Sequence, residues 1–147
     1  PIKLKPQSEL DRLFSLIIRT AHPKFCHSCG VPHEIKDAQA GHYITRSNFA
    51  VRYHLFNALP VCMTCNFFVH DHVQQLEKRL IELYGEDIID TLNIKKIESF
   101  KATEGQRNWL EKCFSILLKS LTDDTERNVQ KLIETQKMID NLFEKII

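Results

Sequence analysis

Four of the five cysteines form two C-x-x-C pairs, Cys26/Cys29 and Cys62/Cys65. The two sulfurs of one such turn can reach the same ion, and Zn²⁺ binds four thiolates tetrahedrally. The sequence carries no secretory signal, which favours metal ligation over disulfide bonds. We therefore predict one closed structural zinc site. The fifth cysteine, Cys113, falls on the apolar face of an expected helix and is predicted to be a core residue.

The segment between the two pairs is 32 residues long, wider than a compact zinc ribbon needs, so we expect it to have a function of its own. His42, Asn57, Asn66 and His70 are spaced 15, 9 and 4 residues apart along and beyond it. This pattern resembles the HNH nucleases, also called ββα-metal or His-Me finger nucleases. In that family a histidine ends one strand, an asparagine begins the second, and metal ligands lie on the helix that follows.

Two phage subgroups of these nucleases are similar to the stretch from residue 24 to 92. The NinG/Rap recombination nucleases share its motifs in the same order. These are Cys26-His-Ser-Cys29, Gln39-Ala-Gly-His42-Tyr-Ile-Thr-Arg46, Arg52-Tyr53, Asn57 and Cys62-Met-Thr-Cys65-Asn66. Phage endonuclease VII, a dimeric Holliday-junction resolvase, shares the bracketing cysteines and the asparagine after the last one. The resemblance implies a DNA endonuclease of phage recombination that acts on branched DNA such as Holliday junctions.

The resemblance assigns His42 as the general base and Asn57 as the residue that orients the segment around it. A neutral imidazole is suited to taking a proton from water near pH 7. The alternative for His42 is a structural histidine whose hydrogen bonds are satisfied by its surroundings. The alternative for Asn57 is a residue that only forms a turn.

The catalytic cation is expected to be Mg²⁺ or Mn²⁺, held by Asn66 and a histidine. On a continuous helix Asn66 and His70 lie one turn apart on the same face, which favours His70 over the competing His72. HNH nucleases often carry a ligand directly before the base, where this chain has Gly41. Gln39 and Asp37 are candidates for the missing ligand.

Arg46 and Arg52 flank the expected site, and we predict that they bind DNA phosphates, with solvated surface arginines as the alternative. The remaining histidines are expected on the surface: His22, His27, His33 and His54. The net charge of +1 neither indicates nor excludes a nucleic-acid-binding protein. No apolar run is long enough to cross a bilayer, so we expect no membrane partner and a cytoplasmic location, in the host cell if a phage encodes the protein.

The hydrophobic pattern predicts mainly helices. Expected helices cover residues 8–21, 64–84, 87–92, 106–121 and a last segment from residue 122, and expected strands cover 39–44 and 59–61. The predicted class is α+β and mostly helical, a zinc-stapled ββα-metal finger with an N-terminal helix and a C-terminal helical extension.

We expect a nuclease domain over residues 1–100 and a helical extension over 101–147 that pairs two copies into a homodimer. Packing of the extension on its own domain is an equal alternative. Two other functions stay open: an HNH nuclease acting on ordinary duplex DNA, and a non-catalytic zinc-stabilised module that binds nucleic acid.

Overall fold

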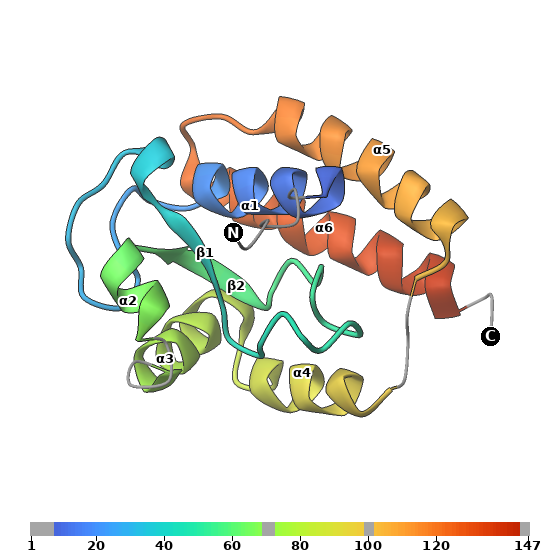
Figure 1. Cartoon of the computed structure of the whole chain (residues 1–147), viewed down its shortest axis with the longest axis horizontal. Coiled ribbons are helices and arrows are strands. Elements are labelled where there is room, and N and C mark those ends of the chain that lie inside the picture. The colour runs from blue at the N-terminus through green and yellow to red at the C-terminus, as the bar shows by residue number, and fades with distance from the viewer. Residues whose placement is uncertain (1–7, 69–72, 99–101, 145–147) are drawn as a thin grey trace, which may run out of the picture.

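The computed structural model describes residues 8–68, 73–98 and 102–144 (Figure 1). Two short strands lie among helices, which confirms a mostly helical α+β protein. In chain order the elements are α1 (Glu9–Ala21), the 3-10 turn η1 (Ile35–Asp37), β1 (Gln39–His42), β2 (Ala58–Val61), α2 (Met63–Phe67), α3 (Val73–Tyr84), α4 (Ile88–Ile97), α5 (Glu104–Ser120) and α6 (Thr125–Glu144).

Helix α1 begins where the sequence predicts. The Ser8 hydroxyl accepts a hydrogen bond from the Asp11 backbone N–H at 3.1 Å, so it satisfies one of the free donors of the first turn. The helix ends at Ala21, two residues before Pro23. Its apolar stripe is fully buried, with Ile17 and Ile18 at 0% exposure.

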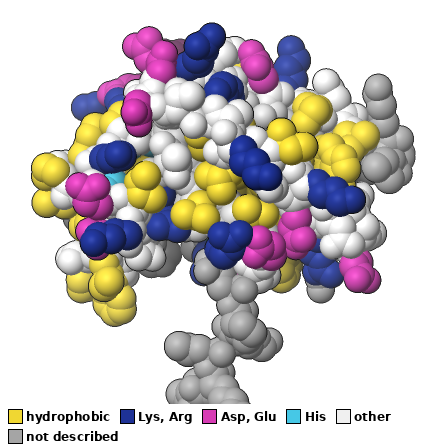
Figure 2. All heavy atoms as spheres, turned by 90° about the horizontal axis from the view of Figure 1, so that it is seen from above, with side chains coloured by type: hydrophobic (Ala, Val, Ile, Leu, Met, Phe, Trp, Pro, Cys, Tyr) yellow, Lys and Arg dark blue, Asp and Glu magenta, His cyan; other side chains and the backbone are white. Residues whose placement is uncertain are grey.

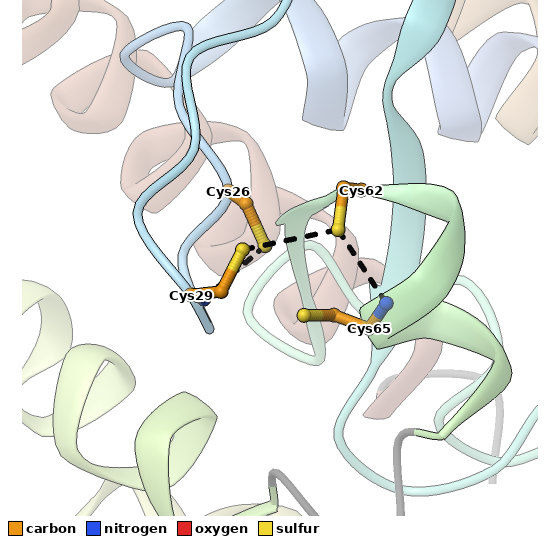
Figure 3. A group of neighbouring side chains, drawn as sticks. All are labelled: Cys26, Cys29, Cys62 and Cys65. Atoms are coloured by element: carbon orange, nitrogen blue, oxygen red, sulfur yellow. Dashed lines mark hydrogen bonds between the residues drawn. The ribbon is translucent and has the colours of Figure 1, made fainter.

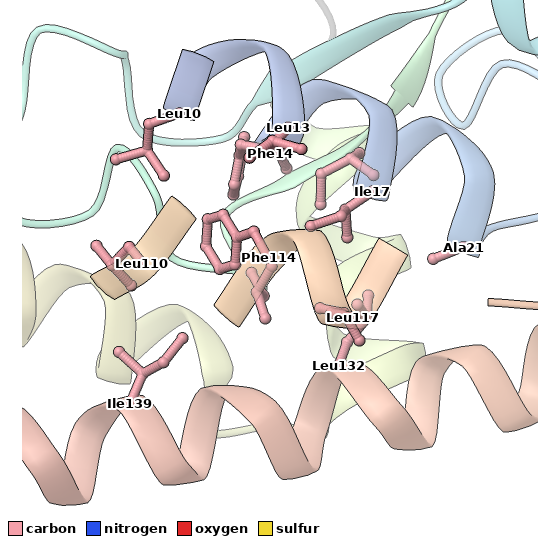
Figure 4. Close-up of a cluster of buried hydrophobic side chains, with 13 residues drawn as sticks. Leu10, Leu13, Phe14, Ile17, Ala21, Leu110, Phe114, Leu117, Leu132 and Ile139 are labelled. Carbon is pink, nitrogen blue, oxygen red and sulfur yellow. The ribbon is translucent and has the colours of Figure 1, made fainter. Parts of the chain in front are cut away.

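This stripe belongs to a first hydrophobic core, here called the helical cluster, which α1 forms with α5 and α6 (Figure 4). Phe14 of α1 and Phe114 of α5 face each other with ring centroids 6.2 Å apart, and Leu132 of α6 lies beneath them. Helix α5 starts with a complete capping box, in which Thr103 and Gln106 each bind the other's backbone N–H.

A second core, here called the finger cluster, joins the hairpin to α3 and α4. Its buried residues are Cys26, Ile44, Val51, Leu59, Val61, Cys65, Leu76, Leu80, Ile88 and Leu92. Strands β1 and β2 pair antiparallel, with His42 opposite Ala58 and Gly41 opposite Leu59. Helix α2 follows β2 directly, which gives the strand–strand–helix order expected for the finger.

The structure corrects the single helix expected over residues 64–84. Helix α2 ends at Phe67, Phe68 is its cap with φ −102° and ψ 33°, and a separate helix begins at Val73. His70 and His72 lie outside the described residues. The preference for His70 assumed one continuous helix through Asn66, and that assumption is wrong.

Three of the histidines expected on the surface are buried instead. His22 is 1% exposed, His27 7% and His54 5%. Burial lowers the pKa of His22 to about 3, because a charged imidazole would lose its hydration there. These rings are therefore neutral and pack as small aromatic groups, which composition alone did not reveal.

The outer surface over α1 and α5 mixes charged and apolar side chains (Figure 2). Exposed apolar residues on the C-terminal helices include Ile116 and Met138, at 71% and 49% exposure. Among the described residues, none of the helices combines the length and the hydropathy needed to cross a bilayer.

Candidate functional site

The four cysteine sulfurs lie together between the loop after α1 and the start of α2 (Figure 3). All four are within 4.8 Å of one another, and the Cys29 and Cys62 sulfurs are 3.9 Å apart. A tetrahedral ion with Zn–S bonds of about 2.3 Å requires sulfurs about 3.8 Å apart. The arrangement therefore fits a structural zinc ion, as the paired motifs predict.

Backbone groups around the sulfurs favour the thiolate form. The N–H groups of Ser28 and Cys29 each point at the Cys26 sulfur at 3.4 Å, and the Cys65 N–H points at Cys62 at 3.5 Å. Burial by itself would raise the pKa of Cys26, but hydrogen bonds from the Cys29 backbone and its neighbours bring it to about 7. Burial raises the pKa of the Cys65 thiol to about 12, so deprotonation of all four thiols requires the positive charge of a bound cation.

A hollow of about 390 Å³ lies between α1, β1, the loop after β1 and α2, which all contribute to its lining. It brings together the predicted base His42, the predicted metal ligand Asn66 and the predicted phosphate ligand Arg46. The rest of its lining is Asp11, Phe14, Ser15, Gln39, Ala40, Thr45 and Ser47. An imidazole, a carboxamide and a guanidinium group thus line one space.

The ring of His42 is held on two sides. Its Nε2 lies 2.9 Å from the Arg52 carbonyl oxygen, and its face stacks on Phe14 with centroids 5.3 Å apart and planes 24° apart. A carbonyl oxygen can only accept, so Nε2 carries the proton and Nδ1 keeps its lone pair. Burial lowers the pKa of His42 to about 4, and the charge of Arg46 acts in the same direction. The ring is a neutral imidazole at physiological pH.

Asn57 is fully buried and binds the loop between the strands from inside. Its side-chain oxygen accepts from the Ile44 N–H at 2.8 Å, while its amide nitrogen donates to the carbonyls of Ile44 and Val51 at 2.9 and 3.0 Å. Its own carbonyl accepts from the Tyr43 N–H at 2.8 Å. The side chain therefore fixes the chain directly after His42.

Arg52 does not point freely at solvent. Its guanidinium donates two hydrogen bonds to the Asp11 carboxylate, at 3.1 and 2.9 Å, and Arg46 lies 3.6 Å from the same carboxylate. Arg46 remains 57% exposed and Arg52 only 20%. Arg46 is thus the arginine available to a phosphate, whereas Arg52 mainly supports the loop whose carbonyl holds His42.

Gly41 is a glycine because its strand position is crowded. A Cβ built there would lie 2.7 Å from Cγ2 of Val61, closer than real contacts allow. A metal-binding side chain could not stand at this position without a change at Val61. Of the two substitutes considered, Gln39 lines the hollow and the exposed Asp37 does not.

The sequence did not predict three residues that contribute to the site: Asp11, Phe14 and Gln136. Asp11 belongs to the first turn of α1 and Phe14 to its buried stripe, and both also line the hollow. Gln136 of α6 is 3% exposed and its side-chain oxygen accepts from the Leu55 N–H at 2.8 Å, so it braces the same loop. A polar residue on the apolar face of a helix was the only available signal for it.

A family model described as "Bacteriophage Lambda NinG protein" matches residues 3–126 of the chain. Curated proteins and solved structures give no match.

Proposed function

Because the chain belongs to the family of the bacteriophage lambda NinG protein, we propose that it is a zinc-stabilised, metal-dependent endonuclease that hydrolyses branched DNA in phage recombination. One observation carries the proposal. His42 and Asn66 share a hollow with Arg46, and His42 is held as a neutral imidazole whose Nδ1 carries the lone pair. This arrangement suits phosphodiester hydrolysis, which needs a base for water and positive charge for the phosphate.

In the proposed reaction Nδ1 of His42 takes a proton from a water molecule, whose oxygen attacks phosphorus as the bond to the leaving 3′ oxygen breaks. The Arg52 carbonyl keeps the imidazole in the tautomer that this step requires. It also stabilises the imidazolium that forms. Arg46 binds a non-bridging phosphate oxygen and balances charge in the transition state.

A divalent cation, Mg²⁺ or Mn²⁺, would act as a Lewis acid on the phosphate and the leaving oxygen. Among the described residues the Asn66 amide offers an oxygen ligand in the hollow, with Gln39 on the same lining. Hard cations prefer such oxygen ligands. His70 or His72 remains the proposed histidine ligand.

The direct test is cleavage of a labelled four-way junction in Mg²⁺ or Mn²⁺. We expect wild type to nick it and His42→Gln to lose activity by about 10²–10⁴-fold, the usual contribution of a general base. Asn108→Ala, an exposed substitution on α5, is the matched control. Zinc content and circular dichroism of each variant exclude misfolding. Undiminished cleavage by His42→Gln would refute the mechanism.

The same assay separates the alternatives. Equal cutting of a linear duplex and a junction would indicate an HNH nuclease for ordinary duplex DNA. DNA binding that needs the cysteines but not His42 or Asn66, without any cutting, would indicate a non-catalytic zinc module.

Resolving a junction requires two symmetric nicks, so we also propose a homodimer built on α5 and α6. Exposed apolar side chains on these helices, Ile116, Met138 and Leu142, support this proposal. Light scattering after size exclusion should give twice the chain mass. A monomer at micromolar concentration would exclude the dimer without affecting the chemistry.

A further inference from the structure

Helix α2 exposes an unusual amount of apolar surface beside the hollow. Phe67 is 79% exposed, Met63 71% and Phe68 47%. Phe67 and Phe68 contact each other edge to face, with centroids 5.0 Å apart and planes at 80°. Aromatic side chains usually bury most of their surface in a soluble protein, so such exposure indicates a binding role.

The exposed rings stand on a rigidly held helix. Cys62 caps α2 and Cys65 is buried within it, so the zinc site fixes its orientation. The Asn66 N–H donates to the Cys62 carbonyl at 2.9 Å and the Phe68 N–H to the Thr64 carbonyl at 3.1 Å. A ring presented from such a base loses little conformational freedom when it binds a planar partner.

The exposed rings of Phe67 and Phe68 directly follow a residue that lines the hollow. Asn66 lines the hollow and Phe67 is the next residue, so their Cα atoms are about 3.8 Å apart. The helix carries no acidic side chain, and Arg46 lies on the same lining as Asn66. The carboxylate of that lining, Asp11, is paired with Arg52 and Arg46, so a polyanion meets no unpaired carboxylate on α2 or in the lining.

We propose that Phe67, braced by Phe68, stacks on an unpaired nucleobase next to the phosphate that is cut, and so selects branch points over continuous duplex. This inference rests on the proposed nuclease function and names the feature of the substrate that the site would recognise. Every nucleobase has a face on which an aromatic ring can stack, so the contact needs no particular sequence. Paired bases inside a duplex have both faces occupied by their neighbours, whereas bases at a branch are easily unstacked.

A protein partner fits this surface less well. Two side chains on a five-residue helix and a third on its cap are far from the roughly 800 Å² that each partner buries in a stable protein interface. A single unstacked base needs only one ring face.

The test uses the His42→Gln background, which binds DNA without cutting it, and compares Phe67→Ala with Phe67→Trp. We expect Phe67→Ala to weaken binding to a four-way junction by about tenfold. Its affinity for a flush duplex should not change, and Phe67→Trp should retain junction affinity. A thymine at the branch should be protected from permanganate oxidation by the parent protein and exposed again with Phe67→Ala.

The matched control is Ile97→Ala, which removes another exposed apolar side chain, 82% exposed on α4. It should leave junction affinity and thymine protection unchanged. Both substitutions are on the surface, so neither should unfold the protein.

Equal junction affinity and equal thymine protection in the parent and Phe67→Ala would overturn the inference. So would a change of oligomeric state in Phe67→Ala, which would identify the rings as a contact between copies. The proposed nuclease function has its own test: it is refuted if the protein with His42 intact cuts no DNA. Phe67-dependent protection would then still show recognition of a branch.

Discussion

The two hydrophobic cores of this protein are held together in different ways. The helical cluster is built mainly from apolar side chains of helices of 13, 17 and 20 residues, to which Leu55 and Ala58 of the hairpin region add. The finger cluster surrounds two strands of four residues each and includes two of the zinc-site cysteines. An isolated two-stranded hairpin is marginal in water, so we expect the second core to depend on a metal ion bound by the four cysteines.

The proposed chemistry lies at the boundary between them. His42 ends β1 in the finger, but its ring stacks on Phe14 of the helical cluster. Asn66, in contrast, directly follows Cys65 within α2, the helix that Cys62 caps. The base and the proposed metal ligand thus depend on different cores, and disturbing one core should affect them unequally.

Removing zinc should have the largest effect. Structural zinc contributes roughly 10 kcal/mol or more to the folding of small zinc modules at neutral pH. We expect chelation, or Cys62→Ser, to unfold the finger while α1, α5 and α6 stay helical. Hydrogen exchange would show lost protection in β1, β2 and α2 and retained protection at the Phe14–Phe114 contact. Uniform loss across both cores would show that they fold as one unit.

The complementary change is Phe114→Ala in the helical cluster. Phe114 is 0% exposed, and truncation of a buried phenylalanine costs about 3–5 kcal/mol. Urea unfolding at saturating zinc should show this loss, with zinc affinity nearly unchanged. Ile116→Ala on the same helix, at 71% exposure, should change stability by less than about 0.5 kcal/mol. A similar loss in both variants would contradict the assigned packing.

A smaller effect is expected at Gly41. Gly41→Ala should destabilise the hairpin by about 1–3 kcal/mol, because its Cβ would meet Val61 at 2.7 Å. Val61→Ala in the same chain should recover part of the loss, since it removes the opposing methyl groups. The coupling is measured by a double-mutant cycle in urea. Additive losses would mean that Val61 is not what requires a glycine here.

The smallest expected effect is that of pH on catalysis. Burial lowers the pKa of His42 to about 4. Between about pH 8 and pH 5.5 the imidazole stays neutral, so its titration should leave kcat/KM unchanged. The base is lost only as the pH falls through about 4. In the unfolded chain the pKa of His42 is about 6.5, so the unfolded state takes up a proton before the folded state does. The folded state therefore loses stability as the pH falls from about 6.5 to about 4. A fall in kcat/KM as the pH drops through about 6.5 would show that the His42 ring is solvated.

Some features were predictable because local chemistry determines them. The C-x-x-C pairs indicated the four-sulfur cluster, and the hydrophobic pattern over residues 8–21 indicated α1. The break between α2 and α3 was not predictable. Its apolar spacing is that of one helix, but the cysteines determine how α2 is placed. Asp11 was likewise hidden, since its second partner, Arg52, is distant in sequence.

Pro60 of β2 limits how copies of the protein can associate. The backbone N and O of a strand residue point to the same side, and the Pro60 carbonyl already accepts from the His27 N–H at 2.9 Å. Proline offers no N–H on that outer side. The free edge of β2 is therefore closed to another strand, which protects a short sheet from edge-to-edge aggregation. A dimer of this protein would have to form through helices rather than by extending its sheet at β2.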